Sequence, residues 1–262
     1  MKYLYIIILS IVIISCSKSD NTPTQSENTT LLKKMISGNQ VINLSYNGFK
    51  LKELTFDGFS GKEIYTYDGD LITEIKYVIP ATNKIEYTES YTYQNNILKT
   101  FINNTERNSN KTIYTYTNNQ DGTVSYIKKD IDKITLVETL RGNGTLTFLS
   151  GVVIKDELFD VNYPNNSNVL SAGSIYEYDN KNSFLKNIIG LNKIYGDKST
   201  YGIFNLLKNY QFTKSLQNGV ITSGNNNPET RTYTYNSNNF PIESKFYEVD
   251  GSLKGTTQYF YE

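Results

Sequence analysis

Short stretches in which apolar and polar residues alternate recur along most of the chain. The clearest run from Ile64 to Tyr67 and from Ser90 to Tyr93, where a threonine separates two tyrosines. Alternation with a period of two is typical of a β-strand that has one face in the core. Asp-Gly-Asp or Gln-Asn-Asn follows each stretch, and then a second apolar stretch begins. Such residues supply the positive φ of tight turns, so the pattern predicts antiparallel hairpins.

The same hairpin unit recurs elsewhere in the sequence. Clear copies begin at Ile113, Ile175 and Thr232, and weaker copies lie around Leu44, Leu146 and Tyr259. Residues two apart share a face of a strand, so the tyrosines lie on one side and the threonines on the other. The tyrosine side is the more apolar, and each buried ring removes roughly 150–250 Å² from water, so we expect it to face inward. The chain is therefore predicted to be all-β, a large antiparallel meander of Tyr-x-Tyr hairpins in a strongly twisted or partly closed sheet.

Two stretches interrupt this alternation. The first, after Tyr178, contains apolar residues at helical spacing behind a serine-threonine cap, namely Ile203, Leu206, Leu207 and Tyr210 behind Ser199 and Thr200. It predicts at most one or two short helices near 184–210. The second, residues 156–174, carries Pro164 among asparagines and is expected to form a long loop. If the chain has a ligand site, the segments 156–174 and 190–228 are where we expect it.

The N-terminus has a different pattern. Lys2 precedes an apolar run from Leu4 to Ile14, and Ser15 and the single cysteine, Cys16, follow it. This arrangement indicates a secretory signal peptide that is too short to span a bilayer as a helix. It resembles the signal of bacterial lipoproteins that the lipoprotein signal peptidase cleaves, which implies that Cys16 carries the lipid. The predicted organisation is a signal peptide over 1–15, a flexible tether over 16–30 and a single β-rich domain over 31–262.

The start of the tether gives an expected location. Residues 17–20, Ser-Lys-Ser-Asp, resemble the surface-export signal of Bacteroidetes lipoproteins. The resemblance implies an outer-membrane lipoprotein at the cell surface or at the periplasmic face. Several acyl chains on one cysteine would anchor the protein stably, so the membrane is an expected partner through the N-terminal lipid.

The hairpins as a group resemble the YD repeats, or Rhs-like hairpins, of bacterial surface proteins. The likeness covers about residues 31–262 and rests on residues 65–71, 176–180, 184–187 and 233–236. The literal Tyr-Asp pair is kept at 67–68 and 178–179. It extends to a group of uncharacterised Bacteroidetes cell-envelope lipoproteins built from such hairpins. The resemblance implies the fold and the cell-envelope location, and it implies no activity.

Charge and missing residue types restrict the chemistry. The 26 basic and 26 acidic residues cancel, so no strongly basic surface is available for nucleic acid, and no nucleic-acid partner is expected. The chain has no histidine, and lipidation of Cys16 leaves no free thiol. Catalysis with a histidine base and typical zinc sites are therefore excluded. We expect no cofactor.

Paired acids are the remaining candidates for a metal site. Asp68 and Asp70 flank a glycine, and Asp130 and Asp132 form a second pair. A calcium loop needs six to eight oxygen ligands, and neither pair has further acids at the required spacing. We therefore predict no metal site and interpret both pairs as acids of turns and strand ends.

The inward tyrosines and the charged residues two positions before them are the candidate ligand contacts. Glu63 and Glu89 are also the natural pair of carboxylates for glycoside hydrolysis. A simpler interpretation is that such charges mark the solvated end of each strand. The candidate ligand-contact residues are Tyr65, Tyr67, Tyr91, Tyr93, Tyr233, Tyr235, Glu63, Glu89 and Arg231.

The function that these observations favour is a lipid-anchored, non-enzymatic binding or scaffold module of unknown ligand. The alternative is a glycan-binding accessory lipoprotein that stacks sugars on exposed tyrosines. A carrier for an apolar ligand would require a dry cavity, and a carboxylate-dependent hydrolase would require two close carboxylates, and both are less favoured. The expected partners besides the membrane are a glycan or another envelope protein.

Overall fold

The computed structural model describes residues 30–58, 61–162, 167–195, 207–214, 216–217, 220–221, 225–248 and 250–262. In the first half of the chain the strands are β1 (Leu32–Ser37), β2 (Gln40–Asn47), β3 (Lys50–Asp57), β4 (Lys62–Asp68), β5 (Leu71–Ile79), β6 (Lys84–Gln94), β7 (Ile97–Thr105), β8 (Asn110–Asn118) and β9 (Val124–Asp132). In the second half they are β10 (Glu138–Leu149), β11 (Val152–Asn162), β12 (Ser167–Tyr178), β13 (Leu207–Lys214), β16 (Asn225–Tyr235), β17 (Pro241–Tyr247) and β18 (Leu253–Tyr261). The short strands β14 (Leu216–Gln217) and β15 (Val220–Ile221) pair only with each other.

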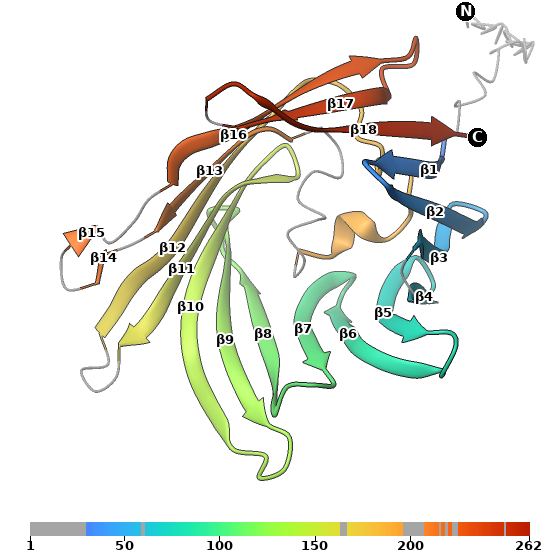
Figure 1. The fold of residues 1–262 in the computed structure, drawn as a ribbon. Coiled ribbons are helices and arrows are strands. Elements are labelled where there is room, and N and C mark those ends of the chain that lie inside the picture. Colours follow the sequence, from blue (N-terminus) through green and yellow to red (C-terminus); the bar gives the residue numbers. More distant parts are fainter. Residues whose placement is uncertain are drawn as a thin grey trace, which may run out of the picture.

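Successive strands pair antiparallel around a ring, which Figure 1 shows from β1 in blue to β18 in red. The first strand, β1, pairs with β2 on one side and with β18 on the other, so the strands form a closed barrel. Ser37 lies opposite Thr257 in this last pairing. The predicted all-β antiparallel meander is confirmed, and hydrogen bonding between the two ends of the meander completes the ring.

The long loop predicted over 156–174 is wrong. Most of this stretch belongs to β11 and β12, which pair from Asn162↔Ser167 to Lys155↔Ile175, while residues 163–166 lie outside the described part. The reason is that β11 continues the ladder of β10, whose pairs reach Gly142↔Asp160. A strand that already has a partner extends through residues of low β-propensity, because propensity is outweighed by pairing and packing.

The prediction that the helical spacing of residues 203–210 forms a helix is wrong for the residues of this stretch that the structure describes. Leu207 and Tyr210 belong to β13, where Tyr210 lies opposite Tyr176 of β12. Ile203, Leu206 and the expected cap at 199–200 lie outside the described residues. The prediction of at most one or two short helices near 184–210 is confirmed for the described residues, which contain one 3₁₀ turn there, η1 (Leu191–Lys193).

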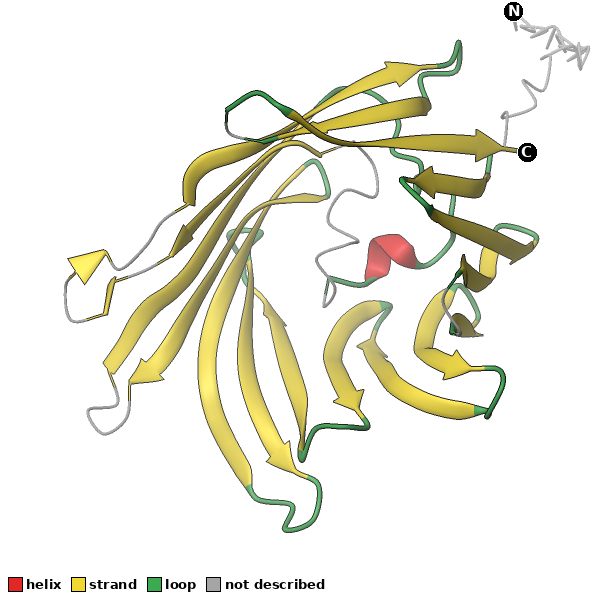
Figure 2. Cartoon of the chain, in the orientation of Figure 1, coloured by secondary structure: helices red, strands yellow, loops and turns green. Residues whose placement is uncertain are grey.

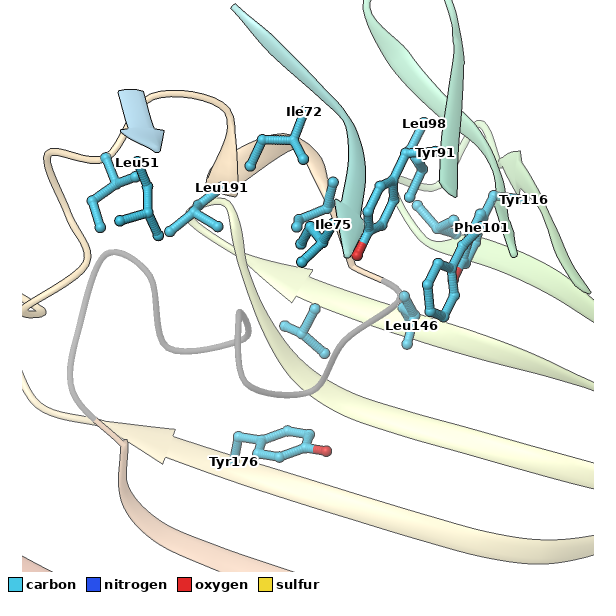
Figure 3. Close-up of a cluster of buried hydrophobic side chains, with 14 of the residues drawn as sticks. Leu51, Ile72, Ile75, Tyr91, Leu98, Phe101, Tyr116, Leu146, Tyr176 and Leu191 are labelled. Carbon is cyan, nitrogen blue, oxygen red and sulfur yellow. The ribbon is translucent and has the colours of Figure 1, made fainter. Parts of the chain in front are cut away.

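The core fills the barrel at the end where the β2–β3, β4–β5 and β6–β7 turns lie. Inward side chains of β1 to β12, such as Leu51, Ile72 and Leu98, form one cluster with the ring of Tyr116. The segment between β12 and β13 contributes Leu191 to this cluster, and Figure 3 shows that side chain near Leu51 and Ile72. We call residues 179–195 the plug segment, because Figure 2 shows its 3₁₀ turn inside the ring of strands. This end of the barrel is therefore filled by its own chain.

Close backbone contact holds the plug segment against the wall. Gly190 has a φ of 86°, and a Cβ on it would lie 2.9 Å from the carbonyl oxygen of Asp70 in the β4–β5 turn. The amide of Ile189 donates a hydrogen bond of 3.0 Å to the carbonyl of Phe49 in the β2–β3 turn. A positive φ at close approach suits only glycine, so residue 190 is where the segment bends onto the strands.

Candidate functional site

The six candidate tyrosines lie on the inner face of the barrel, and none of them is exposed. Tyr91 is only 3% exposed, and its ring stacks on Phe101 at a centroid distance of 5.3 Å. Tyr65, Tyr67 and Tyr93 are half-buried and pack against the core cluster. Their inward orientation is as expected from the alternation. Ligand contact by these tyrosines stays a prediction, and at Tyr91 it would require the ring to leave Phe101.

A repeated hydrogen bond explains why several copies of the hairpin unit have tyrosine rather than phenylalanine as their second aromatic residue. The hydroxyl of Tyr93 on β6 donates to the carbonyl of Ile72 on the neighbouring strand β5, at 2.7 Å. Equivalent bonds run from Tyr46 to Leu32, from Tyr178 to Val153 and from Tyr261 to Pro241, at 2.5, 2.6 and 2.7 Å. A buried phenol needs such a partner. In these four copies of the hairpin unit, the second tyrosine therefore ties its strand to the preceding one.

The ladders shift register next to several of these tyrosines. The shifts fall between Ser45 and Tyr46, between Thr92 and Tyr93 and between Glu177 and Tyr178. A bulge bends a strand and re-aims a side chain, which suits a curved wall whose tyrosines point inward. Burial raises the pKa values of these phenols, that of Tyr67 to about 12. At neutral pH they are therefore hydrogen-bond donors.

The two candidate glutamates also point inward and accept hydrogen bonds from tyrosines. Glu63 accepts from Tyr65 at 2.8 Å and from Tyr87 of β6. Glu89 is 9% exposed and accepts from Tyr91 at 2.5 Å. The two glutamates do not lie at the same level along the strands. Glu63 pairs with Tyr77 of β5, and Glu89 pairs with Ile75, two residues earlier on the same strand.

A third inward carboxylate of the same kind was missed by sequence reasoning. Asp156 on β11 is 7% exposed and accepts a hydrogen bond of 3.0 Å from Tyr126. It was assigned to the expected loop because Pro164 and its asparagines follow soon after. The signal that could have found it is the preceding copy of the hairpin unit at Leu146, because β10 pairs Leu146 directly with Asp156.

The remaining candidate residues, Arg231, Tyr233 and Tyr235, lie on β16 and contact neighbouring elements. The guanidinium of Arg231 lies 5.1 Å from the centre of the Phe246 ring on β17. Burial raises the pKa of Tyr233, and the nearby Arg231 lowers it by a smaller amount. Tyr235 donates a hydrogen bond to Asp179, at the start of the plug segment. Tyr235 therefore links the wall to the plug segment, and ligand contact at these three residues stays a prediction.

The acidic pairs make contacts within the protein. Asp70 lies 3.1 Å from the ammonium of Lys50. Asp130 accepts hydrogen bonds from Thr112 and Arg141, and Asp132 accepts from backbone amides of the β9–β10 turn, which lower the pKa of Asp132. Within the described ranges, no group of three or more His, Cys, Asp or Glu side chains is placed to hold a metal ion.

A groove of ≈ 720 Å³ lies at the plugged end of the barrel, and we call it the plug-end groove. Two hairpin turns form one side, with Asp68, Gly69, Asp70 and Leu71 from the β4–β5 turn and Asn96 from the β6–β7 turn. The plug segment forms the other side, with Lys186, Asn187, Ile188, Ile189, Gly190, Asn192 and Lys193. Its volume is in the range of pockets that bind small molecules.

Sequence reasoning found only part of the plug-end groove. Asp68 and Asp70 were recognised as turn residues, and the segment from 190 onward was named as a place for a ligand site. Residues 186–189 were not assigned to any site. Their two apolar residues, Ile188 and Ile189, are a weak signal for a buried segment, because a short apolar run also suits a strand.

Comparisons with known proteins give a likeness in fold. No family model matches the chain, and no curated protein matches it by sequence. A porin-like protein from Bacteroides vulgatus has a TM-score of 0.58 and 13% identity, over 89% of this chain and 99% of that one. A porin-like protein from Bacteroides uniformis has a TM-score of 0.47 and 11% identity, over 89% of this chain and 96% of that one. No helix among the described residues is long and apolar enough to cross a membrane. In its fold, a large antiparallel sheet, the chain is similar to the porin-like protein of Bacteroides vulgatus.

Proposed function

We propose that the chain is a lipid-anchored cell-envelope protein whose barrel stands in water and acts as a non-enzymatic binding or scaffold module. The observation that carries this proposal is the arrangement of side chains on strands such as β5 and β11, where the core residues face inward and ion pairs lie on the outer face. The Tyr-x-Tyr hairpins that resemble YD repeats supply this wall. The likeness to a porin-like protein supports a place in the cell envelope.

The two faces of the wall differ along each strand. Ile75 on β5 and Tyr91 on β6 are buried inside the barrel, with exposed fractions of 5% and 3%. Their sequence neighbours Lys76 and Ser90 lie on the outer face, because successive side chains of a strand point to opposite sides. Strands of barrels that cross membranes alternate in the opposite sense, with apolar residues toward the lipid.

Ion pairs on the outer face strengthen this argument. Lys76 lies 2.6 Å from Glu74 on β5, and Lys155 lies 2.8 Å from Glu157 on β11. One lysine that faces lipid at the middle of a bilayer costs about 2–4 kcal/mol. The same side chains cost little in water, where both partners stay partly exposed. The outer face therefore suits an aqueous environment.

The anchor and the barrel meet at the plugged end. Asn187 of the plug segment donates a hydrogen bond of 2.9 Å to the carbonyl of Thr30, directly before β1. Residues 16–30 connect this point to the predicted lipid on Cys16. At about 3.3–3.6 Å per residue they reach at most roughly 50 Å. The tether is therefore long enough for the barrel to stand clear of the bilayer.

The proposal is tested by separating the anchor from the barrel. The full chain is expressed in a bacterium that acylates lipoproteins and is labelled with an alkyne analogue of palmitate. In a second version, residues 1–16 are replaced by a signal peptide that the general signal peptidase removes. We expect the full chain to be labelled and to stay with the membrane through a carbonate wash. The second version should be unlabelled and should appear in the aqueous fraction.

Either of two results would contradict the proposal. Membrane retention of the second version through the carbonate wash would mean that the barrel itself is embedded. A full chain that carries no label would mean that Cys16 is not lipidated. Full-length chain with Cys16→Ser is not a sufficient control, because the uncleaved apolar run from Leu4 to Ile14 would itself bind the membrane.

A further inference from the structure

The plug-end groove is built from rigid parts. The β4–β5 turn has a φ of 54° at Gly69, and the β6–β7 turn has φ values of 54° and 61° at Asn95 and Asn96. Two-residue turns of this kind hold their strands in a fixed register. The opposite side is fixed by the contact of Gly190 with the β4–β5 turn. A ligand therefore meets a preformed surface and loses little binding energy to ordering it.

The groove presents hydrogen-bonding groups of both kinds. Asp68 offers carboxylate acceptors, the amides of Asn96 and Asn192 each offer donors and an acceptor, and Lys193 offers donors. All four residues are exposed, so their polar ends are accessible from water. Asp70 differs from Asp68 because the ammonium of Lys50 lies 3.1 Å from it.

The charges of the groove balance. Its lining carries two aspartates and two lysines, and Lys50 pairs with Asp70, so no strong excess of one sign favours a charged ligand. Between these groups, Leu71, Ile188 and Ile189 add an apolar surface. The groove therefore suits a molecule that is neutral, carries many groups that both donate and accept hydrogen bonds, and has some C–H surface. Saccharides have all three properties.

We propose that the plug-end groove binds a short neutral oligosaccharide, with Asp68, Asn96 and Asn192 bonded to sugar hydroxyls. This inference rests on the proposed binding function and names its ligand class. It places the sugar on turns and the plug segment. The inward tyrosines, by contrast, keep their rings within the barrel.

The experiment measures saturation-transfer NMR of sugars with the lipidated full chain in micelles of a detergent without a sugar headgroup. The neutral probes are maltohexaose, cellohexaose and mannohexaose, and trigalacturonic acid is the anionic comparator. Asp68→Asn and Asn192→Ala are the test variants. Asp57→Asn is the matched control, because Asp57 is also exposed and ends β3 at the opposite end of the barrel.

We expect saturable transfer to at least one neutral hexasaccharide. Asp68→Asn should weaken its binding about tenfold, because a hydrogen bond to a charged group is exchanged for one to a neutral group. Asn192→Ala should also weaken it, and Asp57→Asn should leave it unchanged. A retained circular dichroism spectrum shows that each variant is folded.

Three results would overturn the inference. They are no transfer to any neutral probe at 10 mM, unchanged binding by Asp68→Asn, or stronger binding of trigalacturonic acid than of every neutral probe. Failure of the proposed function is distinguishable from all three. It is read from the location of the protein in cells, without any sugar present.

Discussion

Replacement of Gly190 by alanine tests the contact between the plug segment and the barrel wall. Gly190 has a φ of 86°, and a Cβ there would lie 2.9 Å from the Asp70 carbonyl oxygen and 3.0 Å from Cγ1 of Ile72. Gly48 is the matched control. It has a φ of 61° in the β2–β3 turn, and a Cβ on it would meet nothing within 4 Å.

The two substitutions share one energetic term and differ in another. Placing alanine at a left-handed φ costs roughly 1–2 kcal/mol at either position. Only at position 190 does the new methyl group also force a backbone carbonyl or a buried side chain to move. Overpacking of this kind costs about 1–3 kcal/mol. We therefore expect the free energy of unfolding to fall by about 1–2 kcal/mol for Gly48→Ala and by about 2–5 kcal/mol for Gly190→Ala.

The assay is guanidinium unfolding followed by tyrosine fluorescence, with both variants and the parent chain measured at one pH. Equal slopes of free energy against denaturant would show that the same surface is exposed on unfolding, so that midpoints can be compared. A loss at Gly190 no larger than that at Gly48 would refute the reasoning. It would mean that the plug segment is not pressed against the β4–β5 turn.

Three further changes test the interior. Tyr93→Phe removes the hydrogen bond to the Ile72 carbonyl and should lower the free energy of unfolding by about 1–2 kcal/mol, and an unchanged denaturation midpoint would contradict this. Leu98→Ala should cost about 2–5 kcal/mol, since the side chain is 1% exposed, and a loss below 1 kcal/mol would show that it is not in the core. Burial raises the pKa of Tyr114 from 10.0 to about 12, so the neutral phenol stabilises the fold fully below pH 10, and this contribution is lost as the pH rises toward 12. The full loss is on the order of 3 kcal/mol for this tyrosine, and about half of it is reached by pH 11. Denaturation midpoints at pH 8 and pH 11 should therefore differ, and Tyr114→Phe should reduce the difference.

Local patterning was sufficient to predict the hairpins. Alternation around Tyr65 and Tyr91 identified strands, their inward faces and the turns between them, because each of these properties depends on a few neighbouring residues. The pairing of β1 with β18 was not predicted. It joins residues more than 200 positions apart, and the sequence of β1, Leu-Lys-Lys-Met-Ile-Ser, alternates poorly.

The candidate site was harder to predict because its two sides are distant in sequence. Asp68 and Asn96 are ordinary turn residues when read alone. They become part of a groove only because residues 186–193 return to the same end of the barrel. Nothing in the local pattern indicates that return. The acid at 156 was missed for a related reason, since it lies in the polar stretch Lys-Asp-Glu of β11, which pairing with β10 holds in the strand.

The central claim is that the outer face of the barrel lies in water and not in lipid. The most direct measurement is the detergent bound by the purified anchorless chain, obtained with the cleavable signal peptide. Sedimentation equilibrium with and without dodecyl-maltoside gives the mass of detergent bound per protein. The account predicts a chain that stays dispersed without detergent and binds no micelle when detergent is present. A chain that precipitates without detergent and binds a belt of it would contradict the claim.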